Sequence, residues 1–232
     1  MDTYVQQYPT TETILDVQGL PVRIQRIADF EALLATLDPI TFTDDERLPY
    51  WAELWPAAVA LANYLAQRCP LSGRHVLELG CGLGLVGIVA ALRGARVLST
   101  DYEDAALAFA RYNARRNGCA QARFRFMDWR TPALRRRYDY ILASDVIYEA
   151  RNFDPLVLVL RRYLARGGTA LFSEPGRVNA VPFFALVRQH GFTCETTIWP
   201  LAWEGNHQIA IHAIRYAGAG ATPTTTGHPV RA

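Results

Sequence analysis

The sequence predicts an α/β fold in which helices cover both faces of a mostly parallel β-sheet. Three observations carry this prediction. From His75 onward, apolar runs of strand length alternate with longer segments of helical periodicity, which is typical of consecutive βαβ units. A strand that ends in a turn with three alternating glycines is followed at once by an apolar helix. The last two apolar runs have no helix between them, which predicts a closing antiparallel strand pair.

The first 48 residues are expected to form an extension ahead of the main domain. Residues 13–17 and 21–27 alternate between apolar and polar side chains around Gly19, which predicts a short β-hairpin. Residues 28–37 predict a short helix that ends before Pro39. The expected parts of the chain are 1–48 as the N-terminal hairpin and helix extension, 49–216 as the main domain and 217–232 as a disordered tail.

The main domain is expected to begin with an aromatic segment at 49–56 and an apolar helix at 57–67. Strands are then expected at 75–79, 96–100, 123–126, 138–143, 169–173, 192–199 and 208–214. Helices are expected at 83–93, 104–117, 154–165 and 180–190, and glycines 118, 167–168 and 191 are expected to end the last three. Because sheets of this type bind ligands at the carboxyl ends of their strands, the residues that follow the strands are candidates for a functional site.

The composition is that of an ordinary soluble domain, with half of the 232 residues hydrophobic and 20% charged. No apolar run reaches the ~18 residues of a membrane helix and no leader pattern is visible, so a cytoplasmic protein without membrane association is expected. The four cysteines form no C-x-x-C pair and the histidines show no ligand spacing, so neither a metal nor a disulfide is expected. With a net charge of only +2, the arginine clusters are expected to be a solvated surface and not a nucleic-acid site.

The glycine turn after residues 75–79 predicts a nucleotide-binding site. Backbone without side chains allows close approach of a ligand, and the N-terminus of the next helix offers unpaired N–H groups. The glycines can be compared with the dinucleotide pattern G-x-G-x-x-G of dehydrogenases, in which the first glycine directly follows the strand. In this chain that glycine is Gly80, and the last position of the pattern, five residues later, is Leu85 instead of a glycine. They also fit E-x-G-x-G-x-G, which begins at Glu78. A carboxylate there suits a ligand with an ammonium group and would repel a pyrophosphate.

The E-x-G-x-G-x-G motif resembles the first motif of class I S-adenosylmethionine-dependent methyltransferases. The resemblance implies a Rossmann-like, seven-stranded and mostly parallel sheet, with helices on both faces and a C-terminal antiparallel strand pair. It also implies S-adenosylmethionine as the cofactor and S-adenosylhomocysteine as its product. The residues of this motif that are expected to bind the cofactor are Glu78, Gly80, Gly82 and Gly84.

Acidic residues follow the next two predicted strands. Asp101 lies about 20 residues beyond the glycine turn, where a carboxylate can accept hydrogen bonds from both ribose hydroxyls. Tyr102 follows it and is expected to lie against the adenine. In class I methyltransferases, an acid after the third core strand accepts from the adenine amino group and a flat neighbour packs on the ring. The resemblance implies these roles for Asp128 and Trp129, with ordinary core packing as the alternative for Trp129.

The segment from Ser144 to Tyr148 follows the strand predicted at 138–143 and supplies a second motif. Ser144 joins the expected cofactor-binding residues, while the acid Asp145 and the phenol Tyr148 are expected beside the methyl group. DNA amino-methyltransferases carry Pro-Pro-aromatic after an acid or Asn at this place. This chain does not, so an exocyclic base amine is not the expected acceptor. D-x-x-Y instead resembles the protein methyltransferases of methyltransferase family 16, many of which modify lysine.

Two further segments carry the same resemblance, which extends over residues 49–177. The aromatic segment 49–56, which contains Trp55, is similar to the tryptophan-bearing segment ahead of the core in that family. Glu174-Pro175-Gly176-Arg177 resembles the Asp-Pro-Gly-Arg of the branch that methylates the β-subunit of electron transfer flavoprotein, with Glu in place of Asp. The resemblance therefore implies a protein partner that presents a lysine.

The resemblance also implies a role for each candidate at the acceptor site. Asp145 is expected to bind the arriving lysine ammonium and to align the amine, with Tyr148 in an aromatic and hydroxyl wall. Glu174 is expected to add a second carboxylate, and Trp55 either closes over the cofactor or packs in the core. We expect a monomer in which catalysis depends mostly on positioning, because methyl transfer needs the nucleophile, the methyl carbon and the sulfur in line.

Two other functions stay open. Similar bacterial chains are often labelled nicotinamide-N-methyltransferase-like, so the first alternative is a small-molecule N-methyltransferase with a closed pocket. The second is a cofactor-binding protein without catalysis, against which Asp145 and Tyr148 count. All 24 basic residues are arginine, so an enzyme that acts on lysine would have none of its own to modify. A general bias in composition is the simpler interpretation of that absence.

Overall fold

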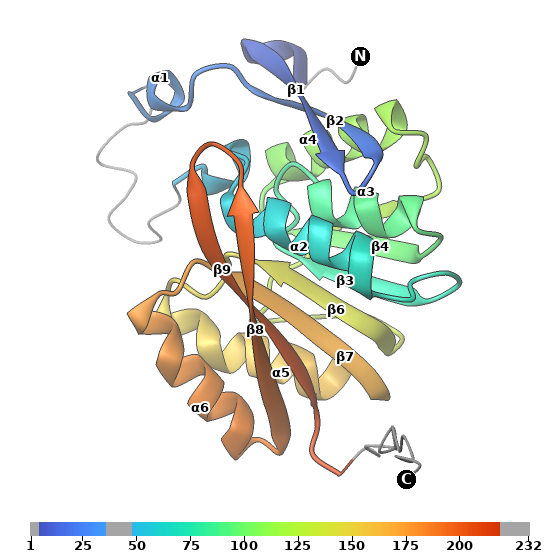
Figure 1. Cartoon of the computed structure of the whole chain (residues 1–232), viewed down its shortest axis with the longest axis vertical. Helices are drawn as coiled ribbons and strands as arrows, with labels where there is room; N and C mark the ends of the chain where they lie inside the picture. Colours follow the sequence, from blue (N-terminus) through green and yellow to red (C-terminus); the bar gives the residue numbers. More distant parts are fainter. Residues whose placement is uncertain (1–4, 36–47, 219–232) are drawn as a thin grey trace, which may run out of the picture.

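The computed structural model describes residues 5–35 and 48–218 of the chain. A seven-stranded sheet carries helices on both faces, and a two-stranded hairpin lies over one of the helix layers (Figure 1). The strand order of the large sheet is β5-β4-β3-β6-β7-β9-β8, in which β9 runs antiparallel to both β7 and β8. The other neighbouring pairs of this sheet are parallel. The predicted α/β fold with its closing antiparallel strands is therefore confirmed.

The hairpin consists of β1 (Thr10–Val17) and β2 (Leu20–Ile27). The strands of the large sheet are β3 (His75–Leu79), β4 (Arg96–Asp101), β5 (Arg123–Phe126), β6 (Tyr138–Ser144), β7 (Leu164–Glu174), β8 (Phe192–Ala202) and β9 (Asn206–Tyr216). The helices are α1 (Phe30–Ala35), α2 (Pro56–Arg68), α3 (Leu85–Leu92), α4 (Asp104–Arg116), α5 (Phe153–Tyr163) and α6 (Val181–Gln189). Short 3-10 helices are η1 (Val5–Gln7), η3 (Tyr50–Ala52), η4 (Ala150–Asn152) and η5 (Val178–Ala180).

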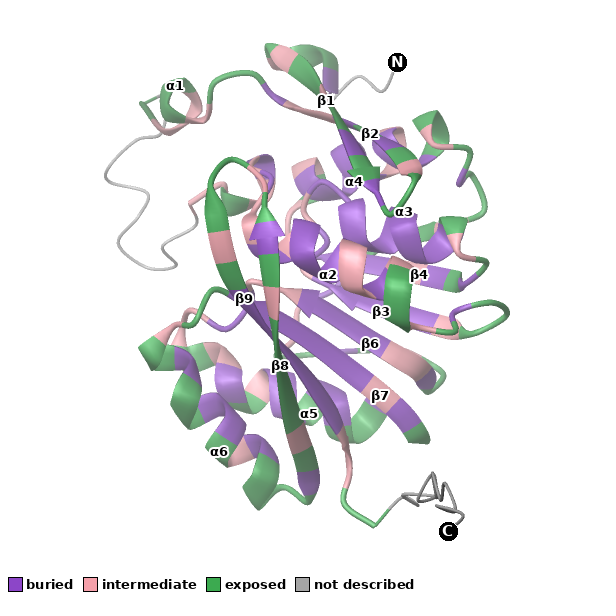
Figure 2. Cartoon of the chain, in the orientation of Figure 1, coloured by how far each residue is buried: buried purple, intermediate pink, exposed green. Residues whose placement is uncertain are grey.

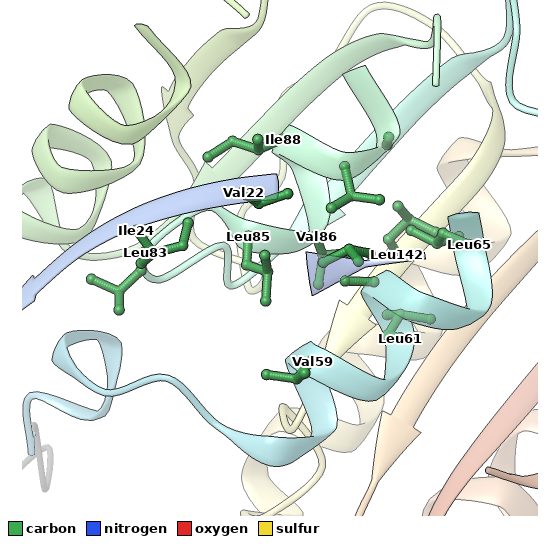
Figure 3. Close-up of a cluster of buried hydrophobic side chains, with 14 of the residues drawn as sticks. Val22, Ile24, Val59, Leu61, Leu65, Leu83, Leu85, Val86, Ile88 and Leu142 are labelled. Carbon is green, nitrogen blue, oxygen red and sulfur yellow. The ribbon is translucent and has the colours of Figure 1, made fainter. Parts of the chain in front are cut away.

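The two faces of the sheet bury separate apolar clusters, because side chains alternate along each strand. Val76 of β3 belongs to the cluster of α2 and α3, whereas its neighbour Leu77 belongs to the cluster of α5 and α6. Figure 2 shows the buried residues in the sheet and along its helices. Figure 3 shows part of the first cluster, with side chains of β2, α2 and α3 and with Leu142 of β6. The parallel strands are thus held in a rigid layered core, and the turns at their carboxyl ends carry the site.

The hairpin is joined to α4 by side-chain amides. Asn113 and Asn117 lie one turn apart on α4, and each accepts from a backbone N–H of β2 and donates to the carbonyl of the same residue. Asn117 bonds to Arg23 at 2.9 and 2.7 Å, and Asn113 bonds to Gln25 at 2.8 and 3.0 Å. The predicted hairpin is therefore confirmed, with β1 beginning three residues earlier than expected, at Thr10.

The predicted end of one helix is wrong. We expect the helix at 154–165 to stop at the glycines 167–168, but α5 ends at Tyr163 and β7 begins at Leu164 and runs through both glycines. The reason is that β7 already pairs with β6 from Leu164 onward, across a register shift. A Cβ on Gly168 would lie 2.8 Å from the carbonyl oxygen of Asp139, so this glycine allows the close approach of the strands instead of ending a helix.

Other boundaries differ by a few residues. β8 and β9 are longer than predicted because their pairing continues to the turn at 203–205, with Pro200 accommodated on the edge strand β8. Most of the predicted polar stretch 41–48 and most of the predicted tail lie outside the described residues. Within the described ranges, no helix combines the length and the apolar composition needed to cross a membrane.

Candidate functional site

A cavity of about 430 Å³ lies where the turns after β3, β4, β5 and β6 meet the segment that leads into α2. Its size is typical of a small-molecule site. The strand order brings these turns together, because β3 lies between β4 and β6. The predicted residues that line the cavity are Trp55, Gly80, Gly82, Asp101, Tyr102, Asp128, Trp129, Ser144, Asp145 and Tyr148. The structure does not place the other three predicted residues, Glu78, Gly84 and Glu174, on its wall.

The glycine turn forms one wall of the cavity. Gly80 follows β3 with a φ of +62°, a conformation that other residues rarely adopt. A Cβ on Gly80 would lie 3.1 Å from Val146 and 3.5 Å from Trp129, so its bare backbone occupies a narrow gap between turns. Gly84 serves another purpose: a Cβ there would lie 2.9 Å from the Cβ of Ala110, so this glycine lets α3 begin against α4.

Glu78 lies with its side chain on the face of the sheet that α3 covers. Its Oε1 accepts from the backbone N–H of Gly87 at 3.0 Å, and its Oε2 accepts from the hydroxyl of Ser99. A Cβ on Gly87 would collide with this carboxyl group. Burial raises the pKa of Glu78 to about 7, although the hydrogen bonds from Ser99 and Gly87 favour the ionised form. The structure therefore shows Glu78 joining β3, β4 and α3, and it does not place this side chain on the cavity wall.

The free energy of unfolding of the wild type is expected to fall as the pH rises from about 5 to about 8, because of Glu78. Replacing Glu78 with glutamine is expected to reduce this fall. The folded chain keeps a proton on Glu78 up to about pH 7, whereas the unfolded chain releases it near 4.5. The stabilisation from this group is therefore complete below the unfolded value and is lost as the pH rises through the folded value. The shift corresponds to about 3 kcal/mol of unfolding free energy, which urea unfolding at the two pH values measures.

The control for this prediction is Glu31→Gln, a substitution of an exposed glutamate on α1. It is expected to leave the pH dependence as in the wild type. If Glu78→Gln lost as much stability as the wild type over the same pH interval, the buried, proton-binding carboxyl group would be refuted.

Asp101 ends β4 and lines the cavity, with only 8% of its surface exposed. Its Oδ2 accepts from the N–H of Gly82 at 2.9 Å, and its Oδ1 accepts from the N–H of Glu103 at 3.0 Å. Burial raises the pKa of Asp101, and these backbone hydrogen bonds oppose the shift. Each oxygen has a second lone pair for a further donor. Asp101 thus fixes the glycine turn and can still accept from a ligand.

The turn after β5 brings the two predicted adenine contacts to the cavity wall. Asp128 forms an ion pair with Arg130, whose Nη2 lies 2.9 Å from Oδ2. The guanidinium carbon of Arg130 lies 5.6 Å from the centre of the Tyr102 ring. Trp129 faces Gly80 from the same turn. Tyr102 and Trp129 therefore present flat side chains to one cavity from neighbouring turns.

The segment before α2 covers the cavity with aromatic side chains. Trp55 precedes α2, and its Nε1 donates to the carbonyl of Tyr50 at 2.8 Å. The centre of the Tyr50 ring lies 6.1 Å from the centre of the Trp55 ring and 5.6 Å from that of the Tyr148 ring, and both contacts are edge-to-face. Burial raises the pKa of Tyr148 to about 12, so its hydroxyl stays protonated at neutral pH. Of the two roles left open for Trp55, its place on the cavity wall favours the one over the cofactor.

Asp145 follows β6 with a φ of +54°, which is uncommon for a residue other than glycine. Its N–H donates to the carbonyl of Ser173 on β7 at 2.8 Å. Its Oδ1 accepts from Nε and Nη2 of Arg177, at 3.0 and 2.9 Å. Burial raises the pKa of Asp145, and the guanidinium of Arg177 opposes the shift. Arg177 lies in a motif that the sequence singled out, but its pairing with Asp145 was not expected.

Glu174 ends β7, but its side chain is buried against β9 and does not reach the cavity. Its Oε1 lies 3.2 Å from Nε2 of His212, and its Oε2 accepts from the N–H groups of Gly176 and Arg177. Burial alone would raise the pKa of Glu174, but the hydrogen bonds from His212 and these backbone groups lower it. The structure thus places Glu174 where it shapes the turn that carries Arg177, and not where it would be a second carboxylate for an acceptor.

The cavity wall also has charged residues outside the predicted site, among them Glu53, Glu149 and Arg151. Glu53 pairs with Arg26 of the hairpin at 3.1 Å, and Glu149 pairs with Arg151 at 2.6 Å. None of them directly follows a predicted strand, so the rule that located the other residues could not find them. They come to the cavity through the short helices η3 and η4 and their flanks.

Comparison with known proteins places the chain in a family. A family model described as lysine methyltransferase matches residues 37–190, more than half of the chain. Protein N-lysine methyltransferase METTL21A of Xenopus tropicalis is 39% identical over 137 residues, which are 56% of this chain and 63% of that protein. EEF1A lysine methyltransferase 3 of Mus musculus is 33% identical over 159 residues, 65% of this chain and 68% of that protein. Electron transfer flavoprotein beta subunit lysine methyltransferase of Danio rerio is 36% identical over 134 residues, 56% of this chain and 52% of that protein.

The match to METTL21A therefore spans about three fifths of that relative's length. Among solved structures, ribosomal protein L11 methylase from Lactobacillus delbrueckii subsp. bulgaricus has a TM-score of 0.56 at 22% identity, over 68% of this chain and 77% of that one. The glycopeptide N-methyltransferase MtfA, complexed with S-adenosylmethionine, has a TM-score of 0.55 at 17% identity, over 69% of this chain and 94% of that one. At such identities the likeness shows the fold alone.

The family model covers more than half of the chain, from residue 37 to residue 190. The methyltransferase interpretation of the glycine turn is therefore favoured over the dehydrogenase one, and the chain belongs to the lysine methyltransferase family.

Proposed function

We propose that the chain is an S-adenosylmethionine-dependent methyltransferase that methylates lysine side chains of a protein substrate. The observation that carries the proposal is that one cavity joins the glycine turn and Asp101 to the pair Asp145 and Tyr148. The first two suit a nucleoside ligand, and the last two suit an amine. Membership in the lysine methyltransferase family and the relatives named for lysine methylation support the same acceptor.

The cavity residues fit S-adenosylmethionine. The backbone at Gly80 borders the cavity in a gap that a side chain would fill, which is what close approach of a ligand requires. Asp101 keeps lone pairs that can accept from the two ribose hydroxyls. Tyr102 and Trp129 offer flat faces to a purine, and the cavity of about 430 Å³ is large enough for a cofactor. These residues would hold the cofactor between the turns after β3, β4 and β5.

Bound S-adenosylmethionine supplies a methyl group on a sulfonium, from which the carbon passes to a nucleophile while the bonding electron pair stays on sulfur. A lysine arrives as an ammonium with a reference pKa of about 10.4, so it must lose a proton before its lone pair can form the N–C bond. Asp145 presents Oδ2, to which no described residue donates a hydrogen bond, and this oxygen can accept an N–H and then the proton. The hydroxyl oxygen of Tyr148 can accept a second N–H. Once Oδ2 carries the proton, a turn about the Cε–Nζ bond of the lysine directs the lone pair away from Asp145, while the oxygen of Tyr148 still holds an N–H.

The proposal is tested by incubating the purified chain with methyl-labelled S-adenosylmethionine and a lysate, followed by acid hydrolysis of the protein fraction. Label is expected in methylated lysine. The chain itself cannot contribute methyllysine, because all 24 of its basic residues are arginine. Label that enters only small molecules would favour the small-molecule N-methyltransferase. Binding of S-adenosylhomocysteine without any transfer would favour a binding protein without catalysis.

A further inference from the structure

We propose that Arg177 is a positioning residue, which orders the carboxylate of Asp145 from outside the cavity so that one oxygen stays available to the acceptor amine. The inference deepens the proposed function and rests on it. It concerns a side chain that is absent from the described cavity wall, and it gives the buried pair Glu174 and His212 a purpose as the support of that side chain.

The ion pair between Arg177 and Asp145 is asymmetric. Nε and Nη2 of Arg177 both donate to Oδ1 of Asp145, at 3.0 and 2.9 Å. Among the described residues, none donates a hydrogen bond to Oδ2. Asp145 lines the cavity and Arg177 does not, and the side chain of Arg177 is 38% exposed while that of Asp145 is 9% exposed. The guanidinium therefore grips one oxygen from the outer side and leaves the other without a protein donor.

Asp145 is held in two independent ways, through its main chain and through its carboxyl group. Its main chain has a φ of +54° and is anchored by the hydrogen bond from its N–H to Ser173 on β7. That bond fixes the backbone but leaves the carboxyl group free to rotate about Cβ–Cγ. Two charge-assisted hydrogen bonds on a single oxygen stop this rotation. Arg177 thus supplies the restraint that the backbone cannot.

The turn that carries Arg177 is itself held by the buried side chain of Glu174. The N–H groups of Gly176 and Arg177 both donate to Oε2 of Glu174. Oε1 of Glu174 lies 3.2 Å from Nε2 of His212, whose ring stacks on Phe184 with 3.8 Å between ring centres. Nδ1 of His212 lies 2.9 Å from the hydroxyl of Thr196. Contacts of the buried Glu174 with β9, and of His212 with α6 and β8, therefore fix the start of the turn that presents the guanidinium.

The charges around Asp145 give the inference a measurable consequence. Glu174 raises the pKa of Asp145 and Arg177 lowers it, in addition to the effect of burial. The other titratable side chains on the wall around the same cavity include Glu53, Asp101, Tyr148, Glu149 and Arg151. Loss of the guanidinium leaves the repulsion from Glu174 unopposed, so the pKa of Asp145 rises. A protonated Asp145 cannot accept the proton of an amine. In a variant without the guanidinium, the rate of methyl transfer is therefore expected to fall at low pH before it falls at neutral pH.

The test compares Arg177→Gln with Arg177→Lys, which keeps the charge, in chains labelled with carbon-13 at the aspartate carboxyl. The signal of Asp145, assigned by its loss in Asp145→Asn, is titrated in the complex with S-adenosylhomocysteine. The apparent pKa is expected to rise by about one unit in Arg177→Gln and to stay closer to the wild-type value in Arg177→Lys. In the lysate assay at neutral pH, Arg177→Gln is expected to label protein lysine about 10-fold more slowly, with the acid side of its pH profile moved upward.

Arg188→Gln, on the exposed side of α6, is the matched control and is expected to match the wild type in titration and rate. Calorimetric affinity for S-adenosylhomocysteine is expected to be unchanged in all three variants, because Arg177 does not line the cavity. An unchanged Asp145 titration and rate in Arg177→Gln would overturn the inference. If the wild type labels no lysine, the proposed function fails on its own, while the titrations still decide whether Arg177 governs Asp145.

Discussion

Replacing Asp145 with asparagine is expected to slow methyl transfer by about 10²–10⁴-fold, the range over which a positioned acid–base group acts. Arg177 donates two hydrogen bonds to Oδ1, so in the variant it selects the amide oxygen and turns the NH₂ group toward the cavity. A donor then faces the N–H groups of the incoming amine, and no group there can take up its proton. Initial rates of label incorporation into protein lysine, at saturating cofactor, measure the effect.

Affinity for S-adenosylhomocysteine is expected to be unchanged in Asp145→Asn, because the substitution keeps the size of the side chain. Asp154→Asn, at an exposed position in the first turn of α5, is the matched control and should transfer methyl groups at the wild-type rate. Wild-type turnover by Asp145→Asn with the cofactor bound would remove Asp145 from the acceptor site.

Replacing Asp101 with alanine is expected to weaken the binding of S-adenosylhomocysteine by about 100-fold or more. The N–H groups of Gly82 and Glu103 lose their acceptors, and the glycine turn loses its connection to β4. The ligand's sugar also loses a charged acceptor, and a hydrogen bond to a charged group contributes roughly 1.5–3 kcal/mol. Isothermal titration calorimetry measures the change.

The control for this variant is Asp104→Ala, which removes an exposed acid three residues later in the first turn of α4. Its affinity for S-adenosylhomocysteine is expected to stay at the wild-type value. Thermal unfolding of both variants without ligand separates a loss of fold from a loss of binding. A folded Asp101→Ala chain that bound the ligand as tightly as the wild type would exclude Asp101 from the nucleoside site.

The sequence was sufficient to locate most of the cavity because strand ends are predictable. The end of an apolar run marks where a strand stops, and a parallel sheet brings the carboxyl ends of its strands to one edge. Asp101, Asp128 and Asp145 were predicted in this way, and all three line the cavity. The end of α5 was wrong because Gly168 looks like a helix stop in one dimension, while in space it faces the backbone of β6.

The direction of two carboxylates could not be predicted from their position in the chain. Side chains alternate along a strand, so a residue near a strand end can face either helix layer or the ligand. Glu78 faces α3, where Gly87 leaves space for it, and a glycine inside an apolar helix was the available signal. Glu174 contacts His212 of β9, a partner that depends on the register of the closing antiparallel strands.

The pairing of Arg177 with Asp145 was out of reach of sequence reasoning for a related reason. The two residues are 32 positions apart, and their contact requires that Ser144 and Ser173 pair across β6 and β7. It also requires the turn that Glu174 closes through the N–H groups of Gly176 and Arg177. The Glu-Pro-Gly-Arg motif drew attention to residues 174–177, but only the register of β6 and β7 shows that Arg177 contacts Asp145.

The amides of Asn113 and Asn117 bear on aggregation and on the order of folding. A two-stranded hairpin has open edges, and an open edge can pair with a strand of another molecule. On β2 the polar backbone groups of Arg23 and Gln25 are already occupied, so this stretch cannot recruit such a strand. Because those partners lie 94 and 88 residues later in the chain, the hairpin is expected to dock late, after α4 has formed.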